Sequence, residues 1–304
     1  MKVFHSLDEF EKTGYITSAA LGFFDGVHLG HRAVIESAVR EKSGLCSVVL
    51  TFSQPPSKTI TGKPPSLLTT NEEKSAIFAA LGVDAVIFAD FAVLKEMSAK
   101  DFVDIVLARQ LRAQKVFCGF NYHFGSGGKG DTAQLCSLCA QNKIEAKIID
   151  SACRKGEAIS STRIRACLTQ GNIKEANEML CRSYSLSGTV SAGNHIGSTL
   201  GFPTVNFPID PAAVVPRFGV YASEILIDGN VYTGATNIGV HPTVKENASP
   251  LCETFLLDFE GGDLYNRRIT CRLTDFIRPE KRFSSLEELQ AQIQQDIRTI
   301  SRAG

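Results

Sequence analysis

Two histidines near the start of the chain have the residue type and the spacing to bind phosphate. They lie in the stretch Leu21–His31 (LGFFDGVHLGH), with His28 and His31 on either side of an expected helix start. Imidazole N–H groups and the unpaired backbone N–H groups of a helix start both donate to phosphate oxygens. Gly22 and Gly30 allow a tight turn and a close approach of the backbone to an anion. This pattern suits attack on the α-phosphate of a nucleotide, where catalysis is mostly positioning and charge stabilisation and needs no protein nucleophile.

From the residues alone, two other interpretations of this histidine pair stay open. The pair can be a structural feature of a helix start, because chance pairs at this spacing are common. A zinc site is the third interpretation, but no neighbouring run of Cys, Asp or His supplies the remaining ligands. The position after a glycine-rich strand end favours the phosphate site.

Two later stretches offer further donors to such a site. Ile159–Arg165 (ISSTRIR) places Ser161 and Thr162 ahead of Arg163, which gives hydroxyl and guanidinium donors at a helix start. Cys118–Asp131 (CGFNYHFGSGGKGD) is a glycine-rich stretch with aromatic residues that could wrap a planar ligand and its phosphate. Taken alone, the first indicates only a well-capped helix and the second a surface loop.

A second candidate site lies in the C-terminal part of the chain. The glycines of Gly193–Asn206 (GNHIGSTLGFPTVN) permit a backbone cradle for phosphates, although no Gly-Lys-Ser/Thr follows and the loop is not a Walker A motif. Thr204 and Asn206 fall on one face of an extended segment, so both side-chain oxygens could reach one Mg²⁺. Without other observations the stretch is a glycine-rich hairpin.

Glu253 opens an apolar strand pattern, ETFLLDF. A strand glutamate most often points to solvent. If its carboxylate is buried near a substrate hydroxyl, its raised pKa would suit proton removal.

The elements that must position these residues follow two different patterns. As far as about residue 183, short apolar segments alternate with amphipathic ones, which indicates a parallel, doubly wound α/β sheet. Ligands of such sheets bind at the carboxyl ends of the strands, so chemistry is expected in the loops that follow them. The expected strands are residues 16–22, 46–52, 84–89 and 115–119, and the expected helices are residues 31–42, 71–81 and 98–112.

The pattern changes near residue 184. Short strands broken by Gly, Pro and Asn continue to about residue 278 and predict a small antiparallel β-barrel. An amphipathic helix closes the chain, with Ser285-x-x-Glu288 as a capping box. The 304 residues therefore divide into two expected domains, 1–183 and 184–304.

Composition excludes several classes of protein. Lys plus Arg and Asp plus Glu both total 32, so the basic excess typical of nucleic-acid binders is absent. We expect neither a signal peptide nor a membrane span, because no apolar run is long enough. Nine scattered cysteines predict reduced thiols in a cytoplasmic protein, and Cys136-x-x-Cys139, which has no second pair, predicts helix packing. The oligomeric state is left open.

Taken together, these stretches resemble the bacterial bifunctional riboflavin kinase/FMN adenylyltransferase family, also called FAD synthetase. His-x-Gly-His early and Ser-Ser-Thr-x-Ile-Arg late is the signature of the HxGH nucleotidylyltransferases. The resemblance covers nearly the whole chain, with the motifs in the family's order: GFFDGVHLGH, FNYHFGSGGKGD, ISSTRIR, SYSLSGTV, TLGFPTVN, FGVYA, TNIGVHPT, ETFLLDFEGGDLY and FIRPEKRFSSLEEL.

The resemblance implies a fold and an activity. The fold is a Rossmann-like adenylyltransferase domain with a parallel sheet, followed by a six-stranded riboflavin-kinase barrel with a C-terminal helix. The activity is phosphorylation of riboflavin to FMN and adenylylation of FMN to FAD and pyrophosphate, with ATP as co-substrate and Mg²⁺ as cofactor. The implied partners are riboflavin, FMN and ATP, without nucleic acid or membrane.

The resemblance also implies roles for individual residues. Glu253 would take the proton from the riboflavin 5′-hydroxyl before attack on the γ-phosphate, and Thr204 and Asn206 would hold Mg²⁺. Asn121 and Asp131 would bind the flavin and help to order the phosphates. The other implied catalytic residues are His28, His31 and Arg163, and the implied ATP-binding residues are Gly22, Phe24, Gly30, Ser161, Thr162, Gly197 and Thr204.

This chain departs from the family pattern at three places, one of which, Val205 in place of the alanine of Pro-Thr-Ala-Asn, is expected to be harmless. Pro55 stands where most members carry the histidine of Thr-Phe-x-Pro-His-Pro, so one phosphate or ring contact of the adenylyltransferase is lost. Ile196 and Ser198 stand where many members carry basic residues, which weakens ATP binding in the kinase loop. These two departures, at Pro55 and in the kinase loop, are expected to affect the efficiency of the enzyme more than its identity.

Two other functions compete with this interpretation. A nucleotidylyltransferase with another acceptor, such as a phosphopantetheine or an alcohol that accepts a cytidylyl group, explains the first half but leaves Glu253 and TLGFPTVN unexplained. A flavin-binding regulator without catalysis would not need the full set of His28, His31, Thr204, Asn206 and Glu253.

Overall fold

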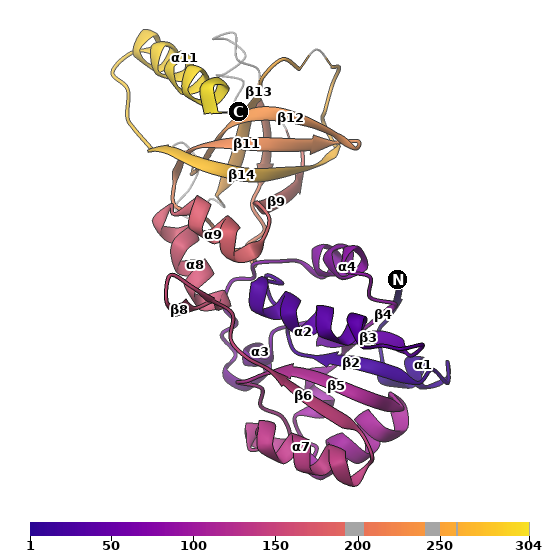
Figure 1. Ribbon diagram of the computed structural model, residues 1–304. Coiled ribbons are helices and arrows are strands. Elements are labelled where there is room, and N and C mark those ends of the chain that lie inside the picture. Colours follow the sequence, from indigo (N-terminus) through magenta and orange to yellow (C-terminus); the bar gives the residue numbers. More distant parts are fainter. Residues whose placement is uncertain (192–203, 241–249, 260, 304) are drawn as a thin grey trace. The chain divides into compact units, whose positions relative to one another are not determined.

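A computed structural model of the chain describes residues 1–191, 204–240, 250–259 and 261–303. Contacts divide the chain into two compact units, Met1–Ser161 and Thr162–Gly304. Figure 1 shows the first unit in indigo to magenta and the sheet of the second in pink to orange.

The first unit is built on a six-stranded parallel sheet with the order β1-β4-β3-β2-β5-β6. The four predicted strands are confirmed within about two residues. The other two, β1 and β6, lie at the sheet edges, where partly exposed strands carry no continuous apolar run. The strands are β1 (Lys2–Phe4), β2 (Thr17–Leu21), β3 (Cys46–Phe52), β4 (Ala85–Ala89), β5 (Ala113–Gly119) and β6 (Glu145–Ile149).

Helices cover both faces of this sheet. Ala20 of β2 packs in one core cluster with α2 and α4, while its neighbour Ala19 packs in the other with α1, η1 and α7. The doubly wound prediction is therefore confirmed. The predicted helix 98–112 is a short turn, α6, followed by a wider π-helix, η1. The helices are α1 (Leu7–Glu11), α2 (Leu29–Arg40), α3 (Pro56–Thr61), α4 (Asn71–Ala80), α5 (Phe91–Leu94), α6 (Ala99–Asp101), η1 (Phe102–Gln110), η2 (Ser126–Gly128) and α7 (Thr132–Gln141), and a small hairpin follows, β7 (Cys153–Arg154) with β8 (Glu157–Ala158).

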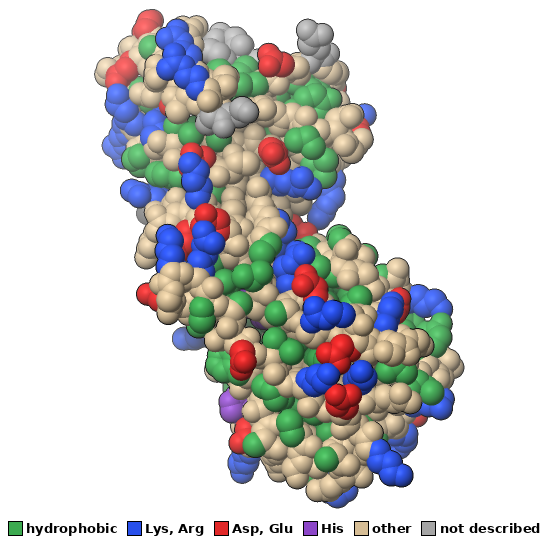
Figure 2. Space-filling model, viewed as in Figure 1, with side chains coloured by type: hydrophobic (Ala, Val, Ile, Leu, Met, Phe, Trp, Pro, Cys, Tyr) green, Lys and Arg blue, Asp and Glu red, His purple; other side chains and the backbone are tan. Residues whose placement is uncertain are grey.

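Opposite charges are interspersed on the face of the first unit that Figure 2 shows. Glu41, the residue after α2, forms an ion pair with Lys147. Glu41 Oε2 also lies 3.5 Å from Lys115 Nζ. Such partly exposed pairs contribute little to stability.

The second unit is a curled antiparallel sheet with the order β10-β13-β12-β11-β14-β9. Its edge strands meet where the Ser191 backbone N–H donates to the Asn206 carbonyl oxygen at 2.8 Å, which confirms the small barrel. The elements are α8 (Ser161–Gln170), α9 (Ile173–Leu180), β9 (Tyr184–Thr189), β10 (Thr204–Pro208), β11 (Gly219–Ile227), β12 (Asn230–Gly239), β13 (Leu251–Leu256), β14 (Arg268–Pro279) and α11 (Leu286–Ala303).

Helix α9 packs on the barrel. Asn177 donates to the Leu273 carbonyl oxygen at 2.8 Å and accepts from the Tyr184 N–H at 2.7 Å. Contacts therefore group α9 with the strands that follow it. The boundary between the catalytic domains at 183/184 stays a prediction.

The closing helix α11 is held to β14 by a charged pair. Both Asp296 carboxylate oxygens accept from the Arg278 guanidinium at 2.8–3.0 Å. One arm of the predicted capping box is present, since Glu288 N–H donates to Ser285 Oγ at 3.2 Å. The other arm was predicted wrongly, because the Glu288 carboxylate accepts from the Ser284 N–H and hydroxyl instead. Across the described ranges, no helix combines the length and apolar character that a bilayer crossing needs.

Candidate active sites

Two of the predicted loops leave the first sheet at one point. In the sheet, β3, β4 and β1 lie on one side of β2, and β5 and β6 lie on the other. The strand order therefore reverses between β2 and β5. The Gly22–His31 loop follows β2 and the Phe120–Asp131 loop follows β5. Open α/β sheets bind ligands in the crevice at this switch point.

The first loop follows a backbone path that only particular residues tolerate. A Cβ at Gly22 would lie 2.8 Å from the ring of Phe24, so only glycine fits there. Phe24 and Val27 have φ values of 55° and 40°, in the left-handed region that non-glycine residues rarely adopt. The surrounding structure has to hold such a conformation.

A buried carboxylate helps to stabilise this loop conformation. Asp25, 3% exposed, accepts from the backbone N–H groups of Leu68 and Thr69 at 2.9 and 3.3 Å. The Thr69 hydroxyl accepts in turn from the Gly26 N–H at 2.9 Å. Sequence reasoning missed both Asp25 and Thr69. The signal for Asp25 was an acidic residue inside a glycine-rich turn.

Two further hydroxyls fasten the loop from other segments. Thr51, in β3, donates to the Phe23 carbonyl oxygen at 3.0 Å. Ser161, one of the predicted ATP-binding residues, donates to the Asp25 carbonyl oxygen at 2.9 Å. Ser161 therefore contacts the Gly22–His31 loop directly.

The two histidines lie together at the start of α2. His28 is the N-cap residue, and its Nδ1 accepts from the His31 N–H at 3.3 Å. With Nδ1 accepting, the ring proton of His28 lies on Nε2, which makes Nε2 the donor. The Phe24 ring meets His31 edge-on at 5.4 Å and is itself buried, and a Cβ at Gly30 would lie 3.3 Å from the His28 ring.

His31 is neutral near pH 7. Burial is the main cause that holds its pKa well below the usual 6.5, and electrostatic interactions with His28 and with the positively charged Lys74 lower it further. Its Nδ1 is buried and has no hydrogen-bond partner within the described ranges. A bound phosphate oxygen would satisfy this nitrogen.

The loop after β5 is shaped by its aromatic residues. Phe124 and Gly130 exchange two backbone hydrogen bonds, at 3.0 and 2.9 Å, and Tyr122 stacks on Phe124. Asn121 is exposed, while Asp131 caps α7 by accepting from the Gln134 N–H at 2.8 Å. Phe120, beside Asn121, is 53% exposed and was not predicted as a site residue.

Three other residues that were discussed for the first site, Thr162, Arg163 and Pro55, lie outside the Gly22–His31 loop. Thr162 and Arg163 group with the second unit, where the Arg163 guanidinium pairs with Glu175 of α9 at 2.6 Å. Pro55 is the N-cap residue of α3 and makes no side-chain cap bond. Position 55 therefore supplies no donor three residues after β3.

The second site brings together three predicted residues on one face of the barrel. Asn206 in β10 lies opposite Glu253 in β13. The Thr204 hydroxyl donates to Glu253 Oε1 at 2.8 Å and accepts from the Asn206 amide at 3.4 Å. Glu253 is half-buried, so the solvent-facing alternative for this carboxylate is set aside.

The donor set of this face fits a hard cation. Asn206 is 6% exposed, and its Oδ1 is buried without a hydrogen-bond partner in the described part of the barrel. An amide oxygen beside a hydroxyl oxygen is the kind of ligand pair that Mg²⁺ takes along with ATP phosphates. Gly197, Ile196 and Ser198 lie outside the described residues.

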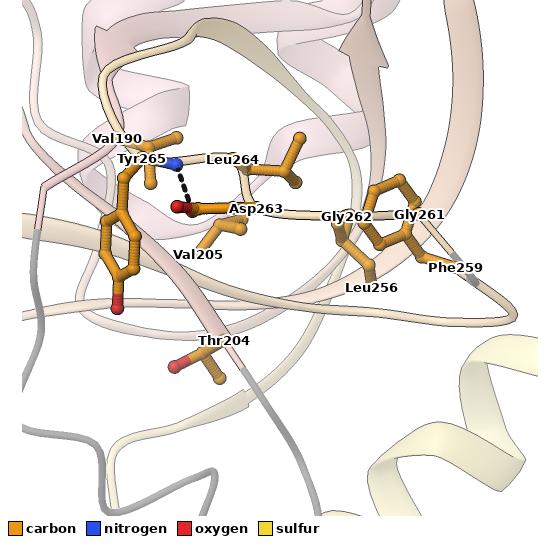
Figure 3. A pocket seen from close by; sticks show the side chains of 10 residues that line it. All are labelled: Val190, Thr204, Val205, Leu256, Phe259, Gly261, Gly262, Asp263, Leu264 and Tyr265. Carbon is orange, nitrogen blue, oxygen red and sulfur yellow. Dashed lines mark hydrogen bonds between the residues drawn. The ribbon is translucent and has the colours of Figure 1, made fainter.

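An open pocket of about 220 Å³ adjoins Thr204 (Figure 3). Its walls include the apolar side chains of Val190, Val205 and Leu256, and Tyr265 stands at its side. The Asp263 carboxylate accepts from the Tyr265 N–H at 2.8 Å and shapes the loop there. The pocket offers apolar surface next to the hydroxyl that contacts Glu253.

No cluster of three or more His, Cys, Asp or Glu side chains is placed to share a metal ion in the ranges described. Cys139 is buried in the core and burial raises its pKa to about 12, as for Cys118. Cys139 thus packs against the sheet, as predicted, and Cys136 is half-buried beside it.

A doubly wound sheet with a histidine pair at a helix start, followed by a small barrel that carries a hydroxyl, an amide and a carboxylate on one face, indicates an enzyme that acts on nucleotides. Comparison with known proteins gives the family. The FAD synthetase family model matches residues 11–163, and the riboflavin kinase model matches residues 180–303. The chain belongs to the bifunctional riboflavin kinase/FMN adenylyltransferase family. It is an enzyme of flavin-cofactor synthesis that forms FMN and then FAD.

Individual relatives agree with this assignment along the whole chain. The bifunctional riboflavin kinase/FMN adenylyltransferase of Listeria monocytogenes is 36% identical over 297 residues, which cover 96% of this chain and 94% of that protein. The Escherichia coli (strain K12) enzyme of the same name is also 36% identical, with 96% and 93% covered. A crystal structure described as a macrolide-efflux protein from Streptococcus pneumoniae has a TM-score of 0.84 at 27% identity and 94% coverage of both chains.

Proposed function

We propose that the first site transfers the adenylyl group of ATP to FMN with His28 and His31 as phosphate donors at the start of α2. The observation that carries this assignment is the stacked histidine pair at a helix N-terminus, with the buried Nδ1 of His31 lacking a partner in the described structure. An FMN phosphate oxygen forms a bond to the α-phosphorus, the bond from that phosphorus to the β-phosphate oxygen breaks, and pyrophosphate leaves. The residues position the phosphates and stabilise charge.

In this assignment the glycines of the loop let the backbone approach the ATP phosphates. Gly22 and Gly30 occupy the positions where a side chain would meet the Phe24 and His28 rings. Ser161 holds the loop through Asp25, and Thr162 and Arg163 follow it in sequence as further ATP donors. Asn121, with Asp131 at the end of the same loop, would bind the flavin.

We propose that the second site phosphorylates riboflavin on the barrel face that carries Thr204, Asn206 and Glu253. Thr204 and Asn206 would hold Mg²⁺, which supplies positive charge to the ATP phosphates when it is bound. The Thr204 hydroxyl orients the Glu253 carboxylate, which removes the proton of the riboflavin 5′-hydroxyl. The apolar pocket beside Thr204 would take a planar ring of one of the two substrates.

The cytoplasm is the proposed compartment. All nine cysteines are free thiols, as expected in a reducing environment.

A time course with purified protein, riboflavin, ATP and Mg²⁺ tests both assignments, with riboflavin, FMN and FAD separated by chromatography. FMN is expected first and FAD afterwards. His28→Ala should stop the series at FMN, and Glu253→Ala should slow FMN formation while FMN supplied directly is still converted to FAD. If instead His28→Ala slows FMN formation and Glu253→Ala blocks only the conversion of FMN to FAD, the two sites are assigned the wrong way round.

A further inference from the structure

A buried lysine lies beneath the phosphate loop of the first site. Lys74 of α4 is 2% exposed. Its Nζ donates to the Phe52 carbonyl oxygen at 3.4 Å and lies 4.5 Å from the centroid of the Phe23 ring and 5.6 Å from that of Phe88. Phe52 ends β3, Phe88 is near the end of β4, and Phe23 follows β2. The ammonium group is therefore at the carboxyl edge of three neighbouring strands, the edge where ligands of such sheets bind.

The charge of this ammonium group is poorly compensated. It has three N–H donors, but among the described residues it makes one long hydrogen bond and no ion pair with a carboxylate. The carboxylate that acts on it from a distance is Asp25, whose Oδ1 already accepts from Leu68 and Thr69. Burial lowers the pKa of Lys74 to about 8. A buried cation that has no counterion in direct contact and lies at a ligand-binding edge indicates an anionic ligand.

Lys74 is electrostatically coupled to the histidine pair. Its positive charge is one of the causes that lower the pKa of His31. It therefore helps to keep the His31 imidazole neutral, with one ring nitrogen able to donate and the other able to accept. The same charge attracts phosphate oxygens placed over the His31 ring, and low-dielectric surroundings strengthen that attraction.

We propose that Lys74 is a cation of the adenylyltransferase site, a positioning residue that acts through its field and through His31 on the ATP phosphates and the departing pyrophosphate. The inference rests on the function proposed for His28 and His31. Lys74 gives up no proton: the electron pair of the broken bond leaves with the pyrophosphate, and the ammonium charge stabilises it. The cation also lies at the end of β3, three residues before Pro55, so it supplies positive charge at the strand end where this chain has no histidine.

The full-length enzyme tests this with Lys74→Met, which keeps the length and apolar stem of the side chain, and Lys74→Arg, which keeps the charge. FAD formation from FMN and ATP is measured with inorganic pyrophosphate as an inhibitor. Phosphorylation of riboflavin by the same samples is the internal control. Lys74→Met should raise both the KM for ATP and the inhibition constant of pyrophosphate about tenfold, with the riboflavin kinase rate unchanged. Lys74→Arg should restore both constants.

The pH profile separates a role for the charge from a role in packing. In the unmodified enzyme kcat/KM for FAD formation should fall above about pH 8 as the Lys74 ammonium loses its proton. The titratable groups that interact electrostatically with Lys74 are Asp25 and His31. This alkaline limb should vanish in Lys74→Met and move to higher pH in Lys74→Arg. If the first unit does not fold in Lys74→Met, as shown by a lowered Tm or a changed circular dichroism spectrum, the test is the shift of the alkaline limb in Lys74→Arg.

Unchanged ATP and pyrophosphate constants in Lys74→Met would overturn the proposal, as would an alkaline limb that neither variant alters. His28→Ala distinguishes that failure from a failure of the proposed function. If His28→Ala still forms FAD at the normal rate, the site itself is assigned wrongly. If His28→Ala is inactive and Lys74→Met behaves normally, only the inference about Lys74 is wrong.

Discussion

The imidazole rings of His28 and His31 are stacked, with 3.6 Å between their centroids and 17° between their planes. The backbone N–H of His31 donates to Nδ1 of His28, so one histidine caps the helix on which the other lies. The pair thus has a structural role and a chemical one. Variants can separate the two.

His28→Asn and His28→Ala should differ in stability but not in activity. Asparagine can cap the helix and alanine cannot, so only His28→Ala should lose about 1 kcal/mol of unfolding free energy in denaturant titrations. Neither side chain replaces the Nε2 donor, so both variants should lose FAD formation. Normal FAD formation by His28→Asn would mean that His28 is a cap and nothing more.

The depressed pKa of His31 should make stability depend on pH. In the unfolded chain His31 titrates near 6.5, and in the folded enzyme well below that. Between the two values the unfolded state binds more protons, so this contribution to stability is complete above about pH 6.5 and is lost as the pH falls below it. Thermal melts of the enzyme and of His31→Gln from pH 7.5 to 5 should show a smaller loss on acidification in the variant. If Tm falls equally with pH in both proteins, His31 does not have a depressed pKa.

Glu253→Gln should slow FMN formation by about 10²–10⁴-fold. Glutamine can still accept the hydrogen bond from Thr204 but cannot take a proton at neutral pH. Conversion of supplied FMN to FAD by the same protein is the control and should not change. A kinase rate near that of the unmodified enzyme would place the base elsewhere.

Asn206→Leu should raise the Mg²⁺ concentration that the kinase needs for half-maximal activity. The substitution keeps the approximate size of the side chain and removes the oxygen that lacks a partner in the described barrel. The measurement is the rate of FMN formation during Mg²⁺ titration after treatment with EDTA. If the titration curve does not move, Asn206 does not bind the metal.

Asp25→Ala should destabilise the first unit, because two buried backbone N–H groups lose their acceptor. The free energy of unfolding should fall by about 1–3 kcal/mol, measured by denaturant unfolding. Asp25→Asn keeps an acceptor oxygen at the same place and should recover much of it. If Asp25→Asn is as unstable as Asp25→Ala, the charge of Asp25 matters more than these two bonds.

Much of the fold was predictable because its signals are local. The segment 46–52 is an uninterrupted run of β-forming residues and became β3 with the same bounds, because a central strand is buried on both faces. β6 has the sequence EAKII at a half-exposed edge, and no such run marks it. α9 was placed with the first domain by its position in the sequence, whereas its contacts with Leu273 and Tyr184 are made far along the chain.

The sequence by itself determined which residues are available for chemistry: the histidine pair after a glycine turn, the Thr-x-Asn pair and the glutamate of the apolar strand. Only the tertiary structure decided which partners they have. The register of β10 with β13 sets Asn206 opposite Glu253, and the strand order sets the β2 and β5 loops side by side. The burial of Lys74 under the phosphate loop could not be predicted, because a lysine in a helical pattern normally faces solvent. It is buried here because α4 packs its Lys74 and Phe78 against the sheet, which depends on strands distant in sequence.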